Sequence, residues 1–133
     1  MMKRIFLSHA ARDHQMASKL AGRLREEGFD VFLQEELPAG ANFALEVGRK
    51  LEKADIMVVL LSPDAVASSW VQREIEYALT SRRLKGRLVP VQVRPTKDIP
   101  WILRHLNFLD LRGEEAGKVD KVVAALKEID DAA

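Results

Sequence analysis

The run Ile56-Met57-Val58-Val59-Leu60-Leu61, followed by Ser62-Pro63, is the most apolar stretch of the chain. Its length and valine content favour a strand, and a strand without polar alternation is typical of a parallel sheet covered on both faces. We therefore predict that residues 56–61 form the central strand of such a sheet and that Ser62-Pro63 ends it.

Strands and helices alternate on both sides of this run. Shorter apolar runs at 4–7, 30–33, 88–93 and 108–111 predict four more strands, and Pro90 indicates that the fourth strand of the chain is short or irregular. Apolar residues at helical spacing predict four helices, marked by Met16, Leu20 and Leu24; by Phe43, Val47 and Leu51; by Val71, Ile75 and Ala78; and by Val119, Val122 and Leu126.

Local signals suggest where two of these helices begin. Asp13 could cap the first helix, and Gly28 could end it. Ser69 and Gln72 have the spacing of a capping box, so the third helix should begin at Trp70. A short turn is expected around residues 101–103.

Five strands alternating with helices define an α/β fold. We expect a flavodoxin-like three-layer sandwich with a five-stranded parallel sheet of order 2-1-3-4-5. The 133 residues fit a single domain over 1–133, and 47% hydrophobic with 31% charged residues allows both a core and solubility.

Composition excludes several classes of protein. The absence of cysteine excludes disulfides, thiolate metal sites and a cysteine nucleophile, and it fits a reducing cytosol. The net charge of +1 with interspersed signs gives no nucleic-acid footprint. No apolar run approaches the roughly 20 residues that span a membrane, and no signal peptide is recognised, so we expect a cytoplasmic protein with no membrane contact.

The topology itself predicts a ligand site. In a sheet of order 2-1-3-4-5, ligands bind beyond the carboxyl ends of the first and third strands, where the loops 8–13, 34–43 and 62–70 should converge. Glu74 lies about one turn into the helix that leaves the last of these loops, and Trp70 lies on the same helix face. The first loop lacks the glycines of a dinucleotide loop or P-loop, the acidic pair of a receiver domain and the Ser/Thr/Gly-rich composition of an FMN site.

Four stretches, in order and at the right separations, resemble the TIR (Toll/interleukin-1 receptor) domain family across nearly the whole chain. They are FLSHA at 6–10 with Asp13, GFDVF at 28–32 with LPAG at 37–40, VVLLSP at 58–63, and SWVQREI at 69–75. The resemblance is to the bacterial NAD-cleaving type, because Glu74 stands at the position of that family's catalytic glutamate.

The resemblance implies an NAD⁺ hydrolase or cyclase that cleaves the nicotinamide–ribose bond in bacterial immune (anti-phage) signalling, with NAD⁺ as substrate and no cofactor or metal. Other family members imply an alternative, a non-catalytic scaffold that self-associates through the 34–43 loop. Either form is commonly joined to a fused or separate sensor domain. A flavodoxin-type domain for another nucleotide is a third interpretation.

One carboxylate suffices for this chemistry, because nicotinamide leaves as a neutral ring and needs no general acid. We expect Glu74 to hydrogen-bond the ribose hydroxyls and to stabilise positive charge on the anomeric carbon. The ordinary alternative is an exposed helix glutamate paired with Arg73 or Lys85.

The remaining candidate substrate-binding residues lie on the three loops and their edges. Each has an ordinary alternative: packing for the aromatic residues, and solvation or capping for the polar ones. The family often carries an aspartate two residues after the aromatic of the second strand; here Gln34 or Glu35 takes over its hydrogen bond, or the activity is lower. The candidates are Ser8, His9, Ala10, Arg12, Phe32, Gln34, Gly40, Phe43, Ser62 and Trp70.

Overall fold

The computed structural model describes residues 3–112 and 116–131. Its core is a five-stranded, all-parallel sheet of order β2-β1-β3-β4-β5, which confirms the predicted flavodoxin-like α/β fold. The strands are β1 (Arg4–Ser8), β2 (Asp30–Phe32), β3 (Ile56–Leu61), β4 (Leu88–Gln92) and β5 (Leu109–Asp110).

Helices connect the strands and cover both faces of the sheet. The α-helices are α1 (His14–Glu26), α2 (Phe43–Lys53), α3 (Pro63–Ala67), α4 (Ser69–Thr80), α5 (Trp101–Arg104) and α6 (Ala116–Asp131). Two 3-10 turns, η1 (Ala11–Asp13) and η2 (Gln34–Glu36), follow β1 and β2. Among the described residues, no helix is both long enough and apolar enough to cross a lipid bilayer.

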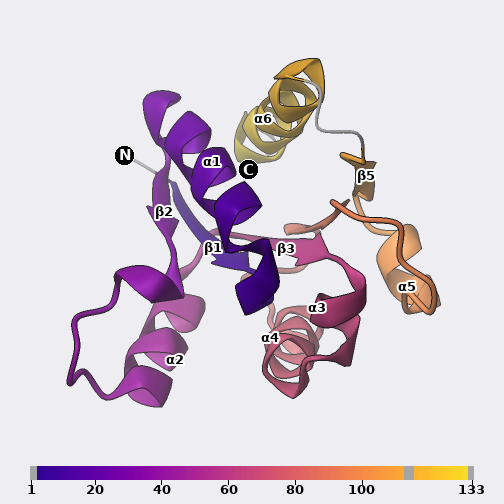
Figure 1. The fold of residues 1–133 in the computed structure, drawn as a ribbon. Helices are drawn as coiled ribbons and strands as arrows, with labels where there is room; N and C mark the ends of the chain where they lie inside the picture. Colours follow the sequence, from indigo (N-terminus) through magenta and orange to yellow (C-terminus); the bar gives the residue numbers. More distant parts are fainter. Residues whose placement is uncertain (1–2, 113–115, 132–133) are drawn as a thin grey trace.

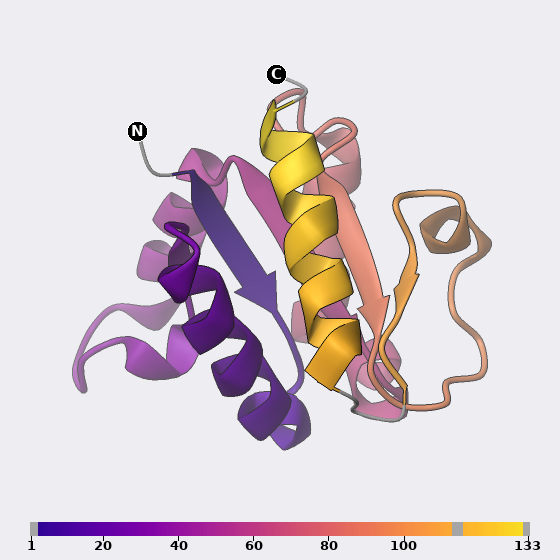
Figure 2. The same ribbon diagram turned by 90° about the horizontal axis from the view of Figure 1, so that it is seen from above.

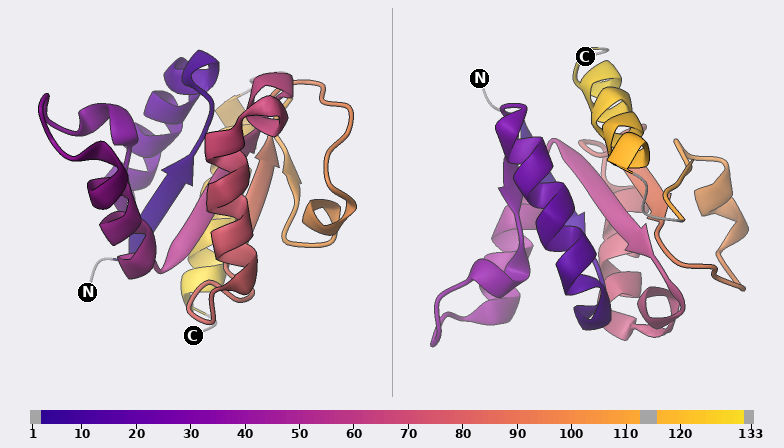
Figure 3. Two further views of the ribbon diagram at one scale, coloured as in Figure 1. Left: turned by 90° about the horizontal axis from the view of Figure 1, so that it is seen from below. Right: turned by 45° about the horizontal axis from the view of Figure 1, so that its top comes forward.

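The sheet separates two hydrophobic clusters. Helices α1 and α6 pack on one face, whereas α2, α3, α4 and α5 pack on the other (Figure 1). Figure 2 looks onto the α1 and α6 side, and the left view of Figure 3 looks onto α2 and α4. All six residues of β3 are buried, as expected for the central strand.

Pro90 does not disturb β4, contrary to the prediction of a short or irregular strand, because all five residues of β4 are paired with β3. The Val93 N–H donates to Leu61 on β3, and the Leu111 N–H donates to the carbonyl of Gln92 on the β5 side. The backbone N–H and C=O groups of odd-numbered residues in β4 therefore point toward β3. The backbone nitrogen of Pro90, an even-numbered residue, points toward β5. Since β5 pairs only with Val91 and Gln92, no donor is needed at Pro90.

At three element ends the local structure differs from what the sequence signals predicted. Helix α4 begins at Ser69 and is capped by Ser68, whose Oγ accepts from the Val71 N–H at 3.2 Å. Ser62-Pro63 ends β3 but also starts α3, with Ser62 as its cap and Pro63 at the first helical position. Gly28, at φ +94°, follows the end of α1 as predicted, but the side chain of Asp13 does not cap that helix.

Candidate active site

Glu74 lies on the face of α4 that packs toward the sheet, where it is only 5% exposed. The hydroxyl of Ser8, the last residue of β1, donates to Glu74 Oε1 at 2.6 Å. The carboxylate therefore lies at the carboxyl end of β1, the strand that pairs with both β2 and β3. The alternative of an exposed helix glutamate is wrong.

The surroundings of Glu74 favour its neutral form. Burial raises the pKa of the Glu74 carboxyl from 4.5 to about 7, while the Ser8 hydrogen bond and, to a smaller degree, the Trp70 indole N–H act in the opposite direction. Glu74 Oε2 is buried and has no hydrogen-bond partner within 3–112 and 116–131. Such an unpartnered buried oxygen is costly, so its lack of a partner within the described residues calls for an explanation.

Gln34 and Phe43 both contact Trp70, which lies one helical turn before Glu74 and acts on its carboxyl. The Trp70 indole N–H donates to Gln34 Oε1 at 3.1 Å. The rings of Phe43 and Trp70 lie 5.6 Å apart between centroids. The structure therefore brings together side chains from all three loops that were predicted to converge.

His9 and Glu35 form a second contact between the first two loops. The side chain of His9 is fully buried, and its Nε2 lies 2.7 Å from Glu35 Oε2. Both residues proposed to replace the family's aspartate thus lie at this edge, Gln34 on Trp70 and Glu35 on His9. The sequence marked His9 and Glu35 as separate candidates. Their contact joins positions 26 residues apart, and no local sequence signal predicts it.

Within the part of the chain that the structure describes, five other predicted residues form no hydrogen bond or ion pair with Glu74. Ala10 is buried at the start of η1, and Gly40 is exposed at φ +85°. Arg12 is exposed and lies 3.6 Å from Asp64. Phe32 packs on Phe6, with ring centroids 5.3 Å apart. The Ser62 hydroxyl donates to Asp13 and accepts from the backbone N–H of Ala65 at the start of α3.

Asp13 has a different role from the predicted cap. It is 2% exposed, and its carboxylate accepts from Ser62 Oγ at 2.5 Å and from Arg94 Nε at 2.7 Å. This network joins η1, the end of β3 and the segment after β4. Sequence reasoning missed it because Arg94 stands 81 residues from Asp13 in the chain.

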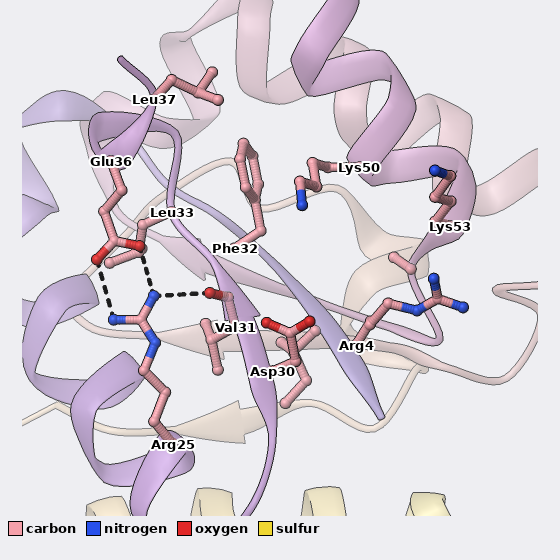
Figure 4. Close-up of a pocket in the computed structure, with 12 residues that line it drawn as sticks. Arg4, Arg25, Asp30, Val31, Phe32, Leu33, Glu36, Leu37, Lys50 and Lys53 are labelled. Atoms are coloured by element: carbon pink, nitrogen blue, oxygen red, sulfur yellow. Dashed lines mark hydrogen bonds and ion pairs between the residues drawn. The ribbon is translucent and has the colours of Figure 1, made fainter. Parts of the chain in front are cut away.

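A hollow of about 550 Å³ lies at the edge strand β2, and Glu74 does not line it (Figure 4). Arg25 lines this hollow, forms an ion pair with Glu36 and donates to the Val31 carbonyl at 2.8 Å. The Lys50 ammonium lies 5.9 Å from the centre of the Phe32 ring. Phe32 thus lines this hollow from the edge strand, and it packs on the same hydrophobic cluster as Trp70.

Comparison of the chain with known proteins identifies its family. Residues 5–126 match the family model of the TIR domain. Over 97 residues the chain is 31% identical to the 2' cyclic ADP-D-ribose synthase BtTIR of Bacteroides thetaiotaomicron, a match that covers 70% of this chain and 33% of the relative. The chain thus spans about a third of the length of this curated relative.

Solved structures agree on the fold. The TIR domain of the Toll-related receptor TRR-2 of Hydra magnipapillata matches with a TM-score of 0.75 at 20% identity, covering 95% of this chain and 97% of that one. A TIR-STING receptor of C. gigas, in complex with 2',3'-cGAMP, matches with a TM-score of 0.76 at 23% identity, covering 92% and 38%. The TIR domains of the activated Roq1 resistosome match with a TM-score of 0.60 at 19% identity, covering 98% and 85%.

The parallel sheet of order 2-1-3-4-5 and the buried glutamate at its carboxyl edge are thus features of an α/β domain similar to known TIR domains. The chain belongs to the TIR domain family.

Proposed function

We propose that this chain cleaves the nicotinamide–ribose bond of NAD⁺, as a hydrolase or cyclase, with Glu74 as its catalytic carboxylate. The observation that carries the proposal is the buried carboxylate of Glu74, which has one oxygen held by Ser8 and the other without a partner within the described residues. The likeness to a protein named 2' cyclic ADP-D-ribose synthase supports the same chemistry.

The chemistry follows from the charge of the substrate. The nicotinamide ring of NAD⁺ is cationic and leaves neutral, so the departing group needs no proton and this step needs no cofactor. Positive charge grows on the anomeric carbon as the bond breaks. A carboxylate fixed in a site of low dielectric stabilises that charge far more strongly than one in water.

Neighbouring side chains complete this picture. Ser8 holds Oε1, so that Oε2 is the oxygen available to a ribose hydroxyl. The paired rings of Trp70 and Phe43 offer an apolar surface on which the nicotinamide or the sugar can pack. Ser8, His9 and Ala10 contribute backbone groups at the end of β1, and Gln34 orients Trp70 through its hydrogen bond.

The test is release of nicotinamide from NAD⁺ by concentrated protein. We expect Glu74→Gln to lower the rate on the order of 10²- to 10³-fold, as loss of a group that stabilises transition-state charge does. The matched control is Glu76→Gln, an exposed glutamate two residues along the same helix, which should keep the parent rate. A Glu74→Gln protein that releases nicotinamide as fast as the parent would refute the proposal.

The second candidate is a scaffold that self-associates through the 34–43 loop. Phe43 at the end of this loop is 42% exposed and Leu45 just beyond it is 47% exposed, and large apolar side chains exposed together mark interaction surfaces. The two functions are compatible, because association can complete a catalytic site.

The wider role rests on the resemblance of the four sequence stretches to bacterial NAD-cleaving TIR domains. We propose a cytoplasmic signalling domain of anti-phage defence, spanning residues 1–133 and coupled to a fused or separate sensor domain. Nucleic acid and membrane are not among its proposed partners, since basic and acidic residues balance at a net charge of +1 and no apolar run approaches the roughly 20 residues that span a membrane.

A further inference from the structure

We propose that His9, His14 and Glu35 form a binding site for a divalent transition-metal ion of the Zn²⁺ class. Each residue offers one ligand atom, and these atoms all lie within 4.8 Å of one another. This site is separate from Glu74, and the inference does not depend on the proposed catalysis.

The distances already approach those of a metal site. Glu35 Oε2 lies 2.7 Å from His9 Nε2 and 3.6 Å from His14 Nδ1. Ligands about 2.0–2.1 Å from a tetrahedral Zn²⁺ stand about 3.4 Å apart. The His14 contact therefore needs little change, and the His9 contact needs to open by well under 1 Å.

The donor set selects the class of ion. Two imidazoles and one carboxylate suit Zn²⁺, Cu²⁺, Ni²⁺ or Fe²⁺, whereas Ca²⁺ and Mg²⁺ prefer oxygen ligands. Three protein ligands leave at least one coordination position for water or another ligand. The chain contains no cysteine, so no thiolate competes for the ion.

The three ligands come from separate elements that the fold brings together. His9 follows β1, His14 begins α1 and Glu35 lies in η2. The rings of His9 and His14 lie roughly parallel, with centroids 6.2 Å apart. The side chains are 0% exposed for His9, 30% for Glu35 and 47% for His14, so the cluster is closed on the protein side and open to solvent on the other.

The contacts of His9 leave it free to bind an ion. Its Nδ1 is buried and has no hydrogen-bond partner in the described part of the chain, so Nε2 makes its only hydrogen bond there. Exchanging this one bond for a metal breaks no other described contact of the imidazole. At 3.6 Å, the contact between His14 Nδ1 and Glu35 is too long for a good hydrogen bond, so little is lost there.

Binding would have a structural consequence at the neighbouring site. Glu35 follows Gln34, which accepts from Trp70, and His9 follows Ser8, which donates to Glu74. An ion at this cluster would therefore fix η2 against the end of β1 and the start of α1. The loop that begins at residue 34 would be held at its first turn.

The test is titration of the tag-free, chelator-treated chain with ZnCl₂ by calorimetry, followed by Co²⁺ substitution and visible absorption. We expect one ion per chain and a Co²⁺ spectrum with ligand-field bands. His14→Ala should weaken binding by at least about tenfold, since changes beyond the ligands alone cost about 10–100-fold. Because His14 is exposed at the start of α1, this variant should fold, which far-ultraviolet circular dichroism checks.

The matched control is His105→Ala, which removes an exposed histidine that contacts Trp101 and no member of the cluster. It should bind Zn²⁺ as the parent does. The proposal is overturned if the parent binds no stoichiometric ion, or if His14→Ala binds as tightly as His105→Ala. In either case the cluster is a histidine–carboxylate hydrogen bond and no more.

Discussion

Glu74 is held where little water reaches it, and this sets the pH at which it carries charge. Because burial raises the pKa of its carboxyl to about 7, half of the free protein is in the anionic form near neutrality. The anion is the form that stabilises an oxocarbenium ion. We therefore expect kcat/KM for nicotinamide release to rise about tenfold per pH unit below about 7 and to level off above it. A flat profile from pH about 5.5 to about 8.5 would contradict this assignment.

The same carboxyl should make the fold less stable as the pH rises from 4.5 to about 7. Between 4.5 and about 7 the folded chain keeps a proton that the unfolded chain releases, so the free energy of unfolding falls as pH rises. The difference between these pKa values corresponds to roughly 3 kcal/mol at most. Glu74→Gln has no such proton to lose.

We therefore expect Glu74→Gln to be more stable than the parent by roughly 1–3 kcal/mol at pH 8, and to lose this advantage at pH 4, below both pKa values. Urea unfolding at the two pH values measures both differences. An advantage of equal size at pH 4 and pH 8 would show that ionisation of Glu74 is not its cause. Glu76→Gln again serves as the exposed control.

At the scale of residues, the sequence was enough to identify candidate site residues but not most of the side-chain contacts between them. Helical spacing placed Glu74 and Trp70 on one face, and the ends of the strands placed Ser8 and Gln34 nearby. It could not pair His9 with Glu35, nor Asp13 with Arg94, because those contacts depend on side-chain directions at the ends of separate strands. Arg12 and Phe32, which were expected near the ligand, contact Asp64 and Phe6, and their binding roles stay predictions.

At the scale of elements, the sequence correctly predicted a serine cap before α4 but placed it one residue too late, at Ser69 instead of Ser68. Ser69 and Gln72 have capping-box spacing, but Gln72 Nε2 donates to the carbonyl of Val66 at 2.6 Å, and Ser68 caps the helix. The cause is α3, which ends at Ala67 and brings its last turn against the start of α4. A helix of five residues is too short for periodicity to reveal.

The two adjacent serines offer a direct test of this boundary. Ser68→Ala should lower the free energy of unfolding by about 1 kcal/mol, because the Val71 N–H loses its acceptor. Ser69→Ala is the matched control and should change stability by less than about 0.5 kcal/mol, since Ser69 is an exposed first residue of the helix. Thermal or urea unfolding distinguishes the two variants. A larger loss of stability in Ser69→Ala than in Ser68→Ala would show that Ser69, and not Ser68, caps the helix.

At the scale of the whole molecule, the order of the sheet could be predicted because few topologies join five parallel strands by right-handed crossovers. The central position of β3 followed from six consecutive apolar residues, and all of them are buried. The edges were less predictable. β5 has only two residues and β2 only three, because an edge strand has a partner on one side alone and its ends depend on that pairing.

Self-association is the remaining whole-molecule question, and the exposed loop at 34–43 gives its test. If association through this loop completes the site, nicotinamide release per chain should rise with protein concentration, in parallel with the mass measured by light scattering. Ala39→Glu places a charge on an exposed position of the loop and should remove both dependences, since an unpaired charge buried in an interface is costly. Ala124→Glu makes the same change on the exposed side of α6 and should leave both intact. Constant activity per chain over the range in which the mass increases would separate association from catalysis and leave the loop as a docking surface alone.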